Sequence, residues 1–146
     1  NADPAVNYGG IGAVIGHEIS HHFDDQGSKY NEQGLLADWW TERDLEAFTD
    51  ATKKLAAQYD AYQPLPGMNI KGDFTLGENI GDLAGLTVAY DAWKHSLGGQ
   101  PSPVIDGYTG DQRFSRWRPP RPCERHGPSR SRHRPAPVCL TAFVCA

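Results

Sequence analysis

The chain has 146 residues, a formal net charge of −4 and three cysteines. It is long enough for one domain with a modest core, and it opens at Asn1 without a methionine or a leader-like apolar run, so we expect an internal piece of a longer protein. No stretch approaches the roughly 18 consecutive apolar residues of a membrane-spanning helix. All three cysteines lie beyond residue 122, which excludes a disulfide or a Cys-type zinc site from the preceding part.

Charge is divided unevenly along the chain. Residues 1–112 hold 17 acidic and 6 basic side chains, a balance of −11, whereas residues 113–146 hold 8 Arg and one Glu, a balance of +7. The basic part also has six prolines and neither Lys nor Asp, as a GC-rich gene gives when it is read out of frame. We therefore predict one folded unit over residues 1–114 and an aberrant, disordered Arg/Pro-rich tail over residues 115–146.

The first predicted element is a helix from about Asn7 to Asp24. Apolar and small residues surround it as far as Gly16, which predicts a helix buried inside a domain. Each of its glycines costs roughly 1 kcal/mol relative to alanine, so we expect another element to approach it closely.

This helix contains His17-Glu18-Ile19-Ser20-His21, the pattern H-E-x-x-H. Residues four apart lie on one helix face, so His17 and His21 can bind the same zinc ion. Glu18 then lies close enough to polarise a water at the open coordination position, the general-base role in metal-assisted peptide hydrolysis. Because the pattern also occurs by chance, a polar helix face with two ordinary histidines is the alternative.

The middle of the chain is predicted to be structural. Residues 28–38 suggest an irregular loop or small hairpin, and Trp39-Trp40 should point to different sides, one of them packing in the core beside the first helix. Thr41, with Asp44 three residues on, resembles a capping box that opens a second helix with one apolar stripe. Prolines and a glycine over residues 63–67 end that helix.

A third helix is predicted from about Leu76 to Leu97. It places Glu78 and Asp82 four residues apart in an otherwise apolar helix. A catalytic zinc site needs three protein ligands and an open position, so Glu78 is the natural third ligand after the two histidines. Asp82 can accept the free ring N–H of a ligand histidine and fix its tautomer. A solvated acidic helix start, stabilised by the helix dipole, is the alternative.

Together, four motifs in this order closely resemble the neprilysin-like zinc metalloendopeptidases, in the bacterial oligopeptidase branch. The motifs are Asn7-Tyr8-Gly9-Gly10-Ile11-Gly12, the pentapeptide at 17–21, Asp38-Trp39-Trp40, and Leu76-Gly77-Glu78-Asn79-Ile80 with Asp82. The resemblance implies a mainly α, thermolysin-like zincin catalytic-domain fragment with short loop or hairpin elements. It also implies one Zn²⁺ held by His17, His21 and Glu78, with Glu18 and Asp82 as the catalytic residues.

The same resemblance implies what the protein acts on and where. Members of the family cut oligopeptides on the amino side of apolar residues, and they are large extracytoplasmic or membrane-anchored proteins. For this chain we expect an oligopeptide substrate, a periplasmic or secreted location and no membrane segment within this piece. The peptide preference and the oligomeric state stay open.

The chain departs from the family pattern at both ends. Upstream, the Asn-Ala substrate-binding strand and the helical lid are missing. Downstream, a His-Ser-Pro-like segment is expected, but His126 and His133 do not sit in that motif. We therefore expect a truncated form with impaired activity.

Two alternatives to a working peptidase follow from these departures. One is a zinc-binding fragment without catalysis. The other is a nucleic-acid-binding module that uses the Arg-rich tail. The second is disfavoured, because the body is acidic and the tail shows no RNA-binding signature, so we expect no nucleic-acid partner.

Overall fold

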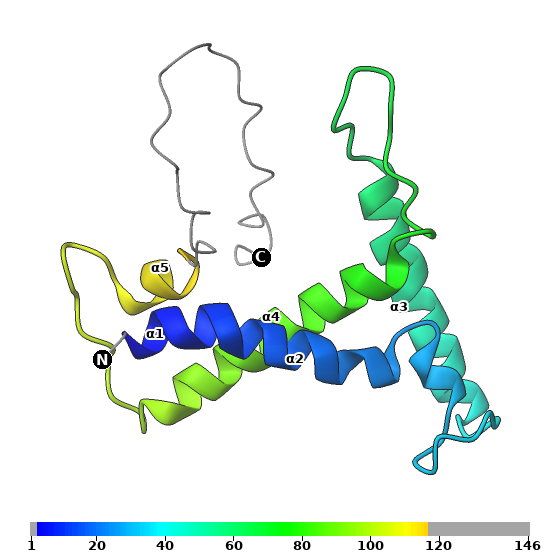
Figure 1. The fold of residues 1–146 in the computed structure, drawn as a ribbon, viewed down its shortest axis with the longest axis horizontal. Coiled ribbons are helices and arrows are strands. Elements are labelled where there is room, and N and C mark those ends of the chain that lie inside the picture. The colour runs from blue at the N-terminus through cyan, green and yellow to red at the C-terminus, as the bar shows by residue number, and fades with distance from the viewer. Residues whose placement is uncertain (1–2, 117–146) are drawn as a thin grey trace, which may run out of the picture.

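The computed structural model describes residues 3–116 (Figure 1). Within this range the secondary structure is helical, and strand pairing is limited to three isolated antiparallel bridges, Tyr30 with Leu36, Leu65 with Met68, and Ile105 with Tyr108. The mainly α prediction is confirmed, and the first bridge gives the predicted small hairpin in the 28–38 loop. Apart from residues 115 and 116, the predicted tail lies outside the described residues.

The first helix is continuous but changes its winding. It starts as α1 (Pro4–Asn7), capped by the Asp3 side chain, passes through a π-helical stretch (Tyr8–Gly12), and continues as α2 (Ala13–Ser20). A 3₁₀ turn (His21–Phe23) ends it. The sequence predicted its end within one residue, but placed its start three residues late and did not anticipate the π-helix, a rare form that tends to occur at functional sites.

The other long helices begin where the sequence predicted. Helix α3 (Glu42–Asp60) is capped by the Thr41 hydroxyl, which accepts from the Asp44 N–H. Its predicted capping box is incomplete, because the Asp44 carboxylate accepts from the same hydroxyl and not from the Thr41 N–H. Helix α4 (Leu76–Ser96) ends one residue before its predicted boundary. A further 3₁₀ turn (Gly27–Lys29) and a short helix α5 (Gly110–Phe114) complete the described helices.

The fold is organised by the pairing of α2 with α4, the most extensive contact between elements. The two helices run antiparallel, side by side, and α3 stands at a steep angle to them where α4 begins (Figure 1). Glycines allow the close approach that the sequence predicted: a Cβ atom added to Gly16 would lie 2.8 Å from the Gly85 Cα. Helix α5 packs on α1 near the other end of α4.

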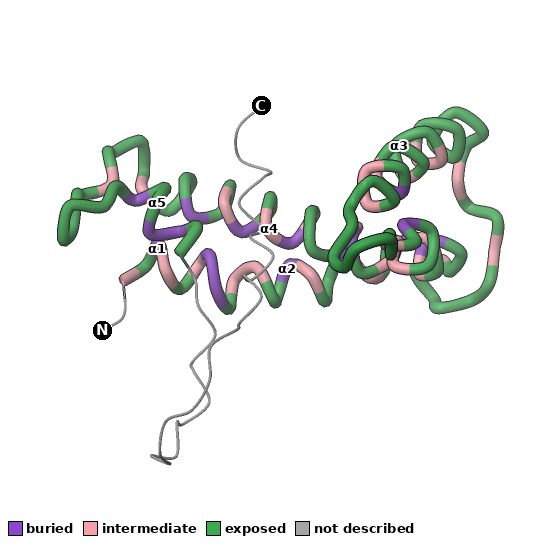
Figure 2. The backbone as a smooth tube through the Cα atoms, turned by 90° about the horizontal axis from the view of Figure 1, so that it is seen from above, coloured by how far each residue is buried: buried purple, intermediate pink, exposed green. Residues whose placement is uncertain are grey.

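The apolar core lies at the α1–α5 end of the pair. It is formed by Ala5, Ala89, Trp93 and Phe114. Figure 2 shows the buried stretches where α1, α2, α4 and α5 face one another, whereas α3 is largely exposed. The prediction that the first helix is buried all round is wrong for the described residues. One side of it is open to solvent, with exposed fractions of 61% for Ile11, 54% for Ile15 and 60% for Ile19.

The prediction for the two tryptophans is also wrong. Trp39 and Trp40 do not point to different sides, because both indole N–H groups donate to the Ser28 carbonyl, at 2.9 and 2.8 Å. Trp40 packs on Phe48 of α3, with ring centroids 5.3 Å apart. A shared acceptor in the preceding loop therefore holds this pair, and neither tryptophan belongs to the core cluster of the described residues.

Among the described residues 3–116, none of the helices combines the length and apolar character that crossing a bilayer requires.

Candidate metal centre

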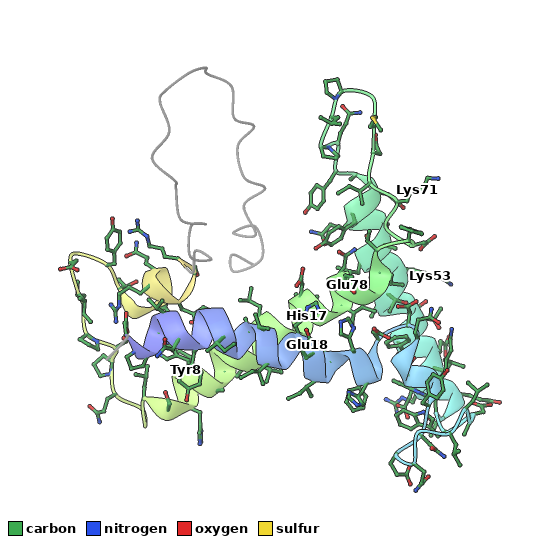
Figure 3. The ribbon with its side chains drawn as sticks, viewed as in Figure 1. Tyr8, His17, Glu18, Lys53, Lys71 and Glu78 are labelled. Atoms are coloured by element: carbon green, nitrogen blue, oxygen red, sulfur yellow. The ribbon has the colours of Figure 1, made fainter. Side chains whose placement is uncertain are left out.

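Three side chains that can bind a metal meet where α2 and α4 cross. His17 is on α2, His21 is the next residue after that helix, and Glu78 is in the first turn of α4 (Figure 3). One ligand atom from each lies within 4.8 Å of the others. The His17 Nε2 atom is 3.3 Å from Glu78 Oε2, and the His21 Nε2 atom is 3.9 Å from Glu78 Oε1.

The two imidazoles are oriented so that the same nitrogen of each faces the glutamate. The rings lie edge to face, with centroids 4.6 Å apart. His17 Nδ1 is 3.0 Å from Asp82 Oδ1, and His21 Nδ1 is 2.8 Å from Asp24 Oδ2. An ionised carboxylate only accepts hydrogen bonds, so these contacts favour the tautomer with the proton on Nδ1. Both Nε2 lone pairs are then available to a metal.

These distances fit a tetrahedral zinc site. Ligand bonds of about 2.0–2.2 Å in that geometry leave neighbouring ligand atoms roughly 3.4 Å apart. The two histidine-to-glutamate distances, 3.3 and 3.9 Å, run to different oxygens of the carboxylate, and the three ligand atoms lie within 4.8 Å of one another, so the side chains would draw closer around one ion. Two imidazole nitrogens and one carboxylate are also a ligand set of catalytic zinc sites, which keep a fourth position open.

Asp24 belongs to this centre, and the sequence analysis did not identify it. The Asp24 side chain is buried, and its Oδ1 accepts from the backbone N–H groups of Gln26 and Gly27, at 2.8 and 2.7 Å. Burial alone would raise the pKa of this carboxyl, but the hydrogen bonds from Gly27, His21 and Gln26 outweigh it and lower the pKa. Asp24 thus stays ionised and holds His21. Its separation from His21 by three residues was the available signal.

Negative charge surrounds the second histidine. The Asp24 hydrogen bond is the main reason that the pKa of His21 is raised; burial opposes it, and the charges of Glu78, Asp24 and Glu18 add to it. An environment that stabilises a positively charged ring also stabilises a bound cation in its place. The electrostatics of the site therefore favour a divalent metal.

Glu18 and Asp82 occupy different positions around the cluster. Asp82 lies one turn beyond Glu78 on α4 and reaches His17, as the sequence predicted. Glu18 follows His17 on α2, and its side chain is exposed (Figure 3). Within residues 3–116 no hydrogen bond or ion pair fixes Glu18.

Comparison with solved structures gives close matches. The chain superimposes on the zinc metalloprotease ZMP1 of Mycobacterium tuberculosis, in complex with an inhibitor, with a TM-score of 0.75 and 58% identity, over 77% of this chain and 18% of that one. It also matches PepO of Lactobacillus rhamnosis HN001 with a TM-score of 0.62 and 41% identity, over 78% of this chain and 18% of that one. The first name agrees with the zinc cofactor predicted from the sequence.

Curated relatives agree with these structures. Neprilysin-11 of Caenorhabditis elegans is 44% identical over 115 residues, which are 75% of this chain and 14% of that protein. Endothelin-converting enzyme 1 of Homo sapiens is 43% identical over 113 residues, again 75% of this chain and 14% of that protein. The chain thus spans about one seventh of the length of these relatives.

The family model described as peptidase family M13 matches residues 1–136. The match extends past residue 114, where the sequence predicts a boundary, and that boundary stays a prediction. With a match over most of its length and the relatives above, the chain belongs to peptidase family M13.

Proposed function

We propose that this chain carries the zinc centre of a metalloendopeptidase that hydrolyses oligopeptides. One observation carries the proposal: the Nε2 atoms of His17 and His21 converge on the Glu78 carboxylate, while each Nδ1 is held by its own aspartate. A pair of ordinary surface histidines would not need two separate carboxylates to orient them toward a third. The M13 family match supports the same function.

Zinc, when bound, would act as a Lewis acid on the scissile carbonyl and lower the pKa of a water at the open position. His17, His21 and Glu78 are the residues that would hold it. Glu18, exposed beside the first histidine, would accept the proton of the attacking water and later deliver it to the leaving amine. Asp82 and Asp24 would keep the two imidazoles in the tautomer that binds metal.

Substrate binding is the part of the activity that this chain supports least. Its described residues supply the metal ligands and a base, yet the chain spans only 18% of the ZMP1 chain. We therefore propose that the chain binds zinc but, by itself, cleaves peptides slowly. Removing one donor that stabilises the transition-state oxyanion typically costs about 100- to 1,000-fold in rate. An extracytoplasmic location is part of this proposal, because the resemblance to the neprilysin-like enzymes implies it.

A non-catalytic zinc-binding fragment is the second candidate, and a grafting experiment distinguishes it. Residues 3–114 would replace the matching segment of ZMP1, to which they are 58% identical. Zinc content and cleavage of a short apolar peptide would be measured for the graft and for its Glu18→Gln and Glu78→Gln variants. We expect the parent graft to cleave the peptide and both variants to be inactive. The Glu18→Gln variant should keep its zinc, whereas Glu78→Gln should lose it or bind it more weakly.

Two results would contradict the proposal. An inactive parent graft that still binds zinc would support the non-catalytic candidate. Full activity in Glu18→Gln would show that another group takes the proton, because glutamine keeps the shape of glutamate without its basicity.

A further inference from the structure

The closest approach of α2 to α4 is a contact between two glycine backbones. A Cβ atom added to Gly85 would lie 2.4 Å from the His17 backbone N and 2.6 Å from the Ala13 carbonyl O. From the other side, a Cβ atom on Gly16 would lie 2.8 Å from the Gly85 Cα. The obstructing atoms belong to helix backbones and cannot rotate away. Neither position therefore accepts even a methyl group at the present helix spacing.

This contact lies next to the metal centre. Gly16 precedes His17, and Gly85 lies on α4 about two turns after Glu78. The three candidate ligands come from α2, from the turn that follows it and from α4. The distance between these two helices thus sets how far the histidine Nε2 atoms lie from the Glu78 carboxylate. It also sets the 3.0 Å contact between His17 and Asp82.

We propose that Gly85 is a positioning residue of the metal centre, which lets α2 and α4 approach to the spacing at which His17, His21 and Glu78 share one zinc ion. The inference rests on the proposed function. An ordinary Cβ contact is 3.4–4 Å, so an alanine at 85 would push the helices apart by roughly 1 Å. Zinc–ligand distances tolerate only about 0.2 Å. Part of the displacement can be absorbed by rotation of the Glu78 side chain, so zinc binding should weaken without being abolished.

A general packing role and a positioning role make different predictions for Gly85→Ala. In a helix interior, alanine is favoured over glycine by about 1 kcal/mol, so α4 itself gains helix propensity. Any loss of zinc affinity would then arise from helix spacing and not from a weaker helix. Gly12 offers a matched control in the same interface, because a Cβ atom there would meet its nearest neighbours, Ala89, Asn7 and Tyr8, at 3.6–3.7 Å, an ordinary contact.

The experiment uses the full 146-residue chain and its Gly85→Ala, Gly16→Ala and Gly12→Ala variants. Zinc dissociation constants would be measured by competition with a chromophoric chelator. The Co²⁺ absorption spectrum would report the coordination geometry, and circular dichroism the helix content. We expect the zinc dissociation constant to rise about 10- to 100-fold in Gly85→Ala, the range seen when a group that orients a ligand is removed. Its Co²⁺ spectrum should change, and Gly12→Ala should match the parent in both.

Four other outcomes would contradict the positioning role of Gly85 or the proposed function, or would move the test to Gly16→Ala. If Gly85→Ala keeps its helix content and binds zinc within threefold of the parent, the proposal is wrong. If Gly85→Ala is unfolded, Gly16→Ala, with its milder clash, takes its place under the same criterion. Unfolding of both would show that the contact holds the fold as a whole and would also overturn the positioning role. A parent chain that binds no zinc would instead contradict the proposed function.

Discussion

At the residue scale, each histidine of the metal centre depends on a carboxylate that does not face the metal position. The Nδ1 atoms of His17 and His21 are 3.0 and 2.8 Å from Asp82 and Asp24. The two carboxylates differ in exposure, because the Asp24 side chain is 9% exposed and the Asp82 side chain 47% exposed. Water can replace Asp82 more easily than Asp24. We therefore expect zinc binding through His21 to depend more strongly on Asp24 than zinc binding through His17 depends on Asp82.

Asp24→Asn should therefore weaken zinc binding about 10- to 100-fold. The asparagine oxygen would keep the hydrogen bonds from Gln26 and Gly27, which leaves its NH₂ group facing His21 Nδ1. That nitrogen must then accept, so the ring proton moves to Nε2 and blocks metal binding. Zinc affinity of this variant, measured beside Asp25→Asn, tests the argument. In the described part of the chain the Asp25 side chain accepts a hydrogen bond from Gln26 alone, which makes Asp25→Asn the matched control. Equal effects in both variants would refute a specific role for Asp24.

The sequence predicted those parts of the centre that depend on helix periodicity. The four-residue spacing and a count of zinc ligands pointed to His17, His21 and Glu78, whose ligand atoms lie within 4.8 Å of one another. Asp24 was missed because it reaches His21 only through the 3₁₀ turn over residues 21–23, which bends the chain back. Which of the two adjacent turn acids, Asp24 or Asp25, faces His21 depends on local backbone dihedrals, not on spacing.

At the element scale, the starts of α3 and α4 were predictable, whereas the surroundings of the helices were not. Thr41 caps α3 by accepting a hydrogen bond from the Asp44 N–H, three residues later. Because both partners are close in the sequence, this boundary could be predicted. The π-helical stretch could not be predicted, because it depends on tertiary packing: a Cβ atom on Gly9 would lie only 2.0 Å from the Phe114 carbonyl oxygen of α5. The same is true of the tryptophan pair, whose common acceptor Ser28 is more than ten residues earlier in the sequence.

A hydrogen bond between helices gives a prediction about alkaline pH. The Tyr90 hydroxyl of α4 donates to Asp111 of α5 at 2.6 Å. That bond, with burial and the charges of Asp111 and Asp91, raises the pKa of Tyr90 to about 12. A raised pKa means that the folded state keeps its proton longer than the unfolded state, whose tyrosine titrates near 10. The stability from this bond is therefore complete below pH 10 and is lost between about pH 10 and 12.

Tyr90→Phe isolates this effect from the other groups that titrate in the same range. Melting temperatures of the parent and the variant, measured from pH 8 to pH 11.5, should differ at neutral pH and converge as the pH rises. The phenylalanine ring keeps the packing on Phe114, whose centroid is 5.1 Å from that of Tyr90. A constant difference across the whole range would mean that the hydroxyl contributes nothing through its ionisation.

At the scale of the whole described structure, Arg113 joins the first and last helices. Its side chain is 9% exposed and pairs with Asp3, the residue that caps α1. The guanidinium also donates to the carbonyls of Pro103 and Tyr108, at 2.8 and 2.7 Å, so it holds the loop before α5 as well. The start of the described chain, the loop before α5 and α5 itself thus share one buried cation.

Replacing Arg113 should lower the free energy of unfolding more than replacing an exposed residue nearby. Arg113→Ala removes the guanidinium from Asp3 Oδ2 and from the Pro103 and Tyr108 carbonyls, and losing one partner of a buried pair costs about 3–5 kcal/mol. Urea unfolding measures the difference. Arg116→Ala is the control, because that side chain is exposed and, within residues 3–116, stacks on the Tyr108 ring, a contact worth about 0.5–1 kcal/mol. A cost for Arg113→Ala no larger than that of the control would refute this role.

The metal centre and the apolar core lie at different positions along the α2–α4 pair, which has a consequence for stability. The core residues Trp93 and Phe114 stabilise the end near α5, whereas the end near α3 holds His17, His21 and Glu78 and leaves Ile19 exposed. Two imidazoles and a carboxylate that face one another add little to the stability of the fold until a cation binds them.

Zinc should therefore raise the melting temperature of the chain, and a chelator should lower it. A ligand that binds only the folded state adds about 2.7 kcal/mol when its concentration is 100 times its dissociation constant. Thermal unfolding with and without saturating Zn²⁺ measures the gain, and Glu78→Ala serves as the control because it removes one of the three ligands that join α4 to α2. The gain should vanish or shrink strongly in that variant. An equal gain in both proteins would show that zinc binds elsewhere, since only binding that bridges the two helices depends on Glu78.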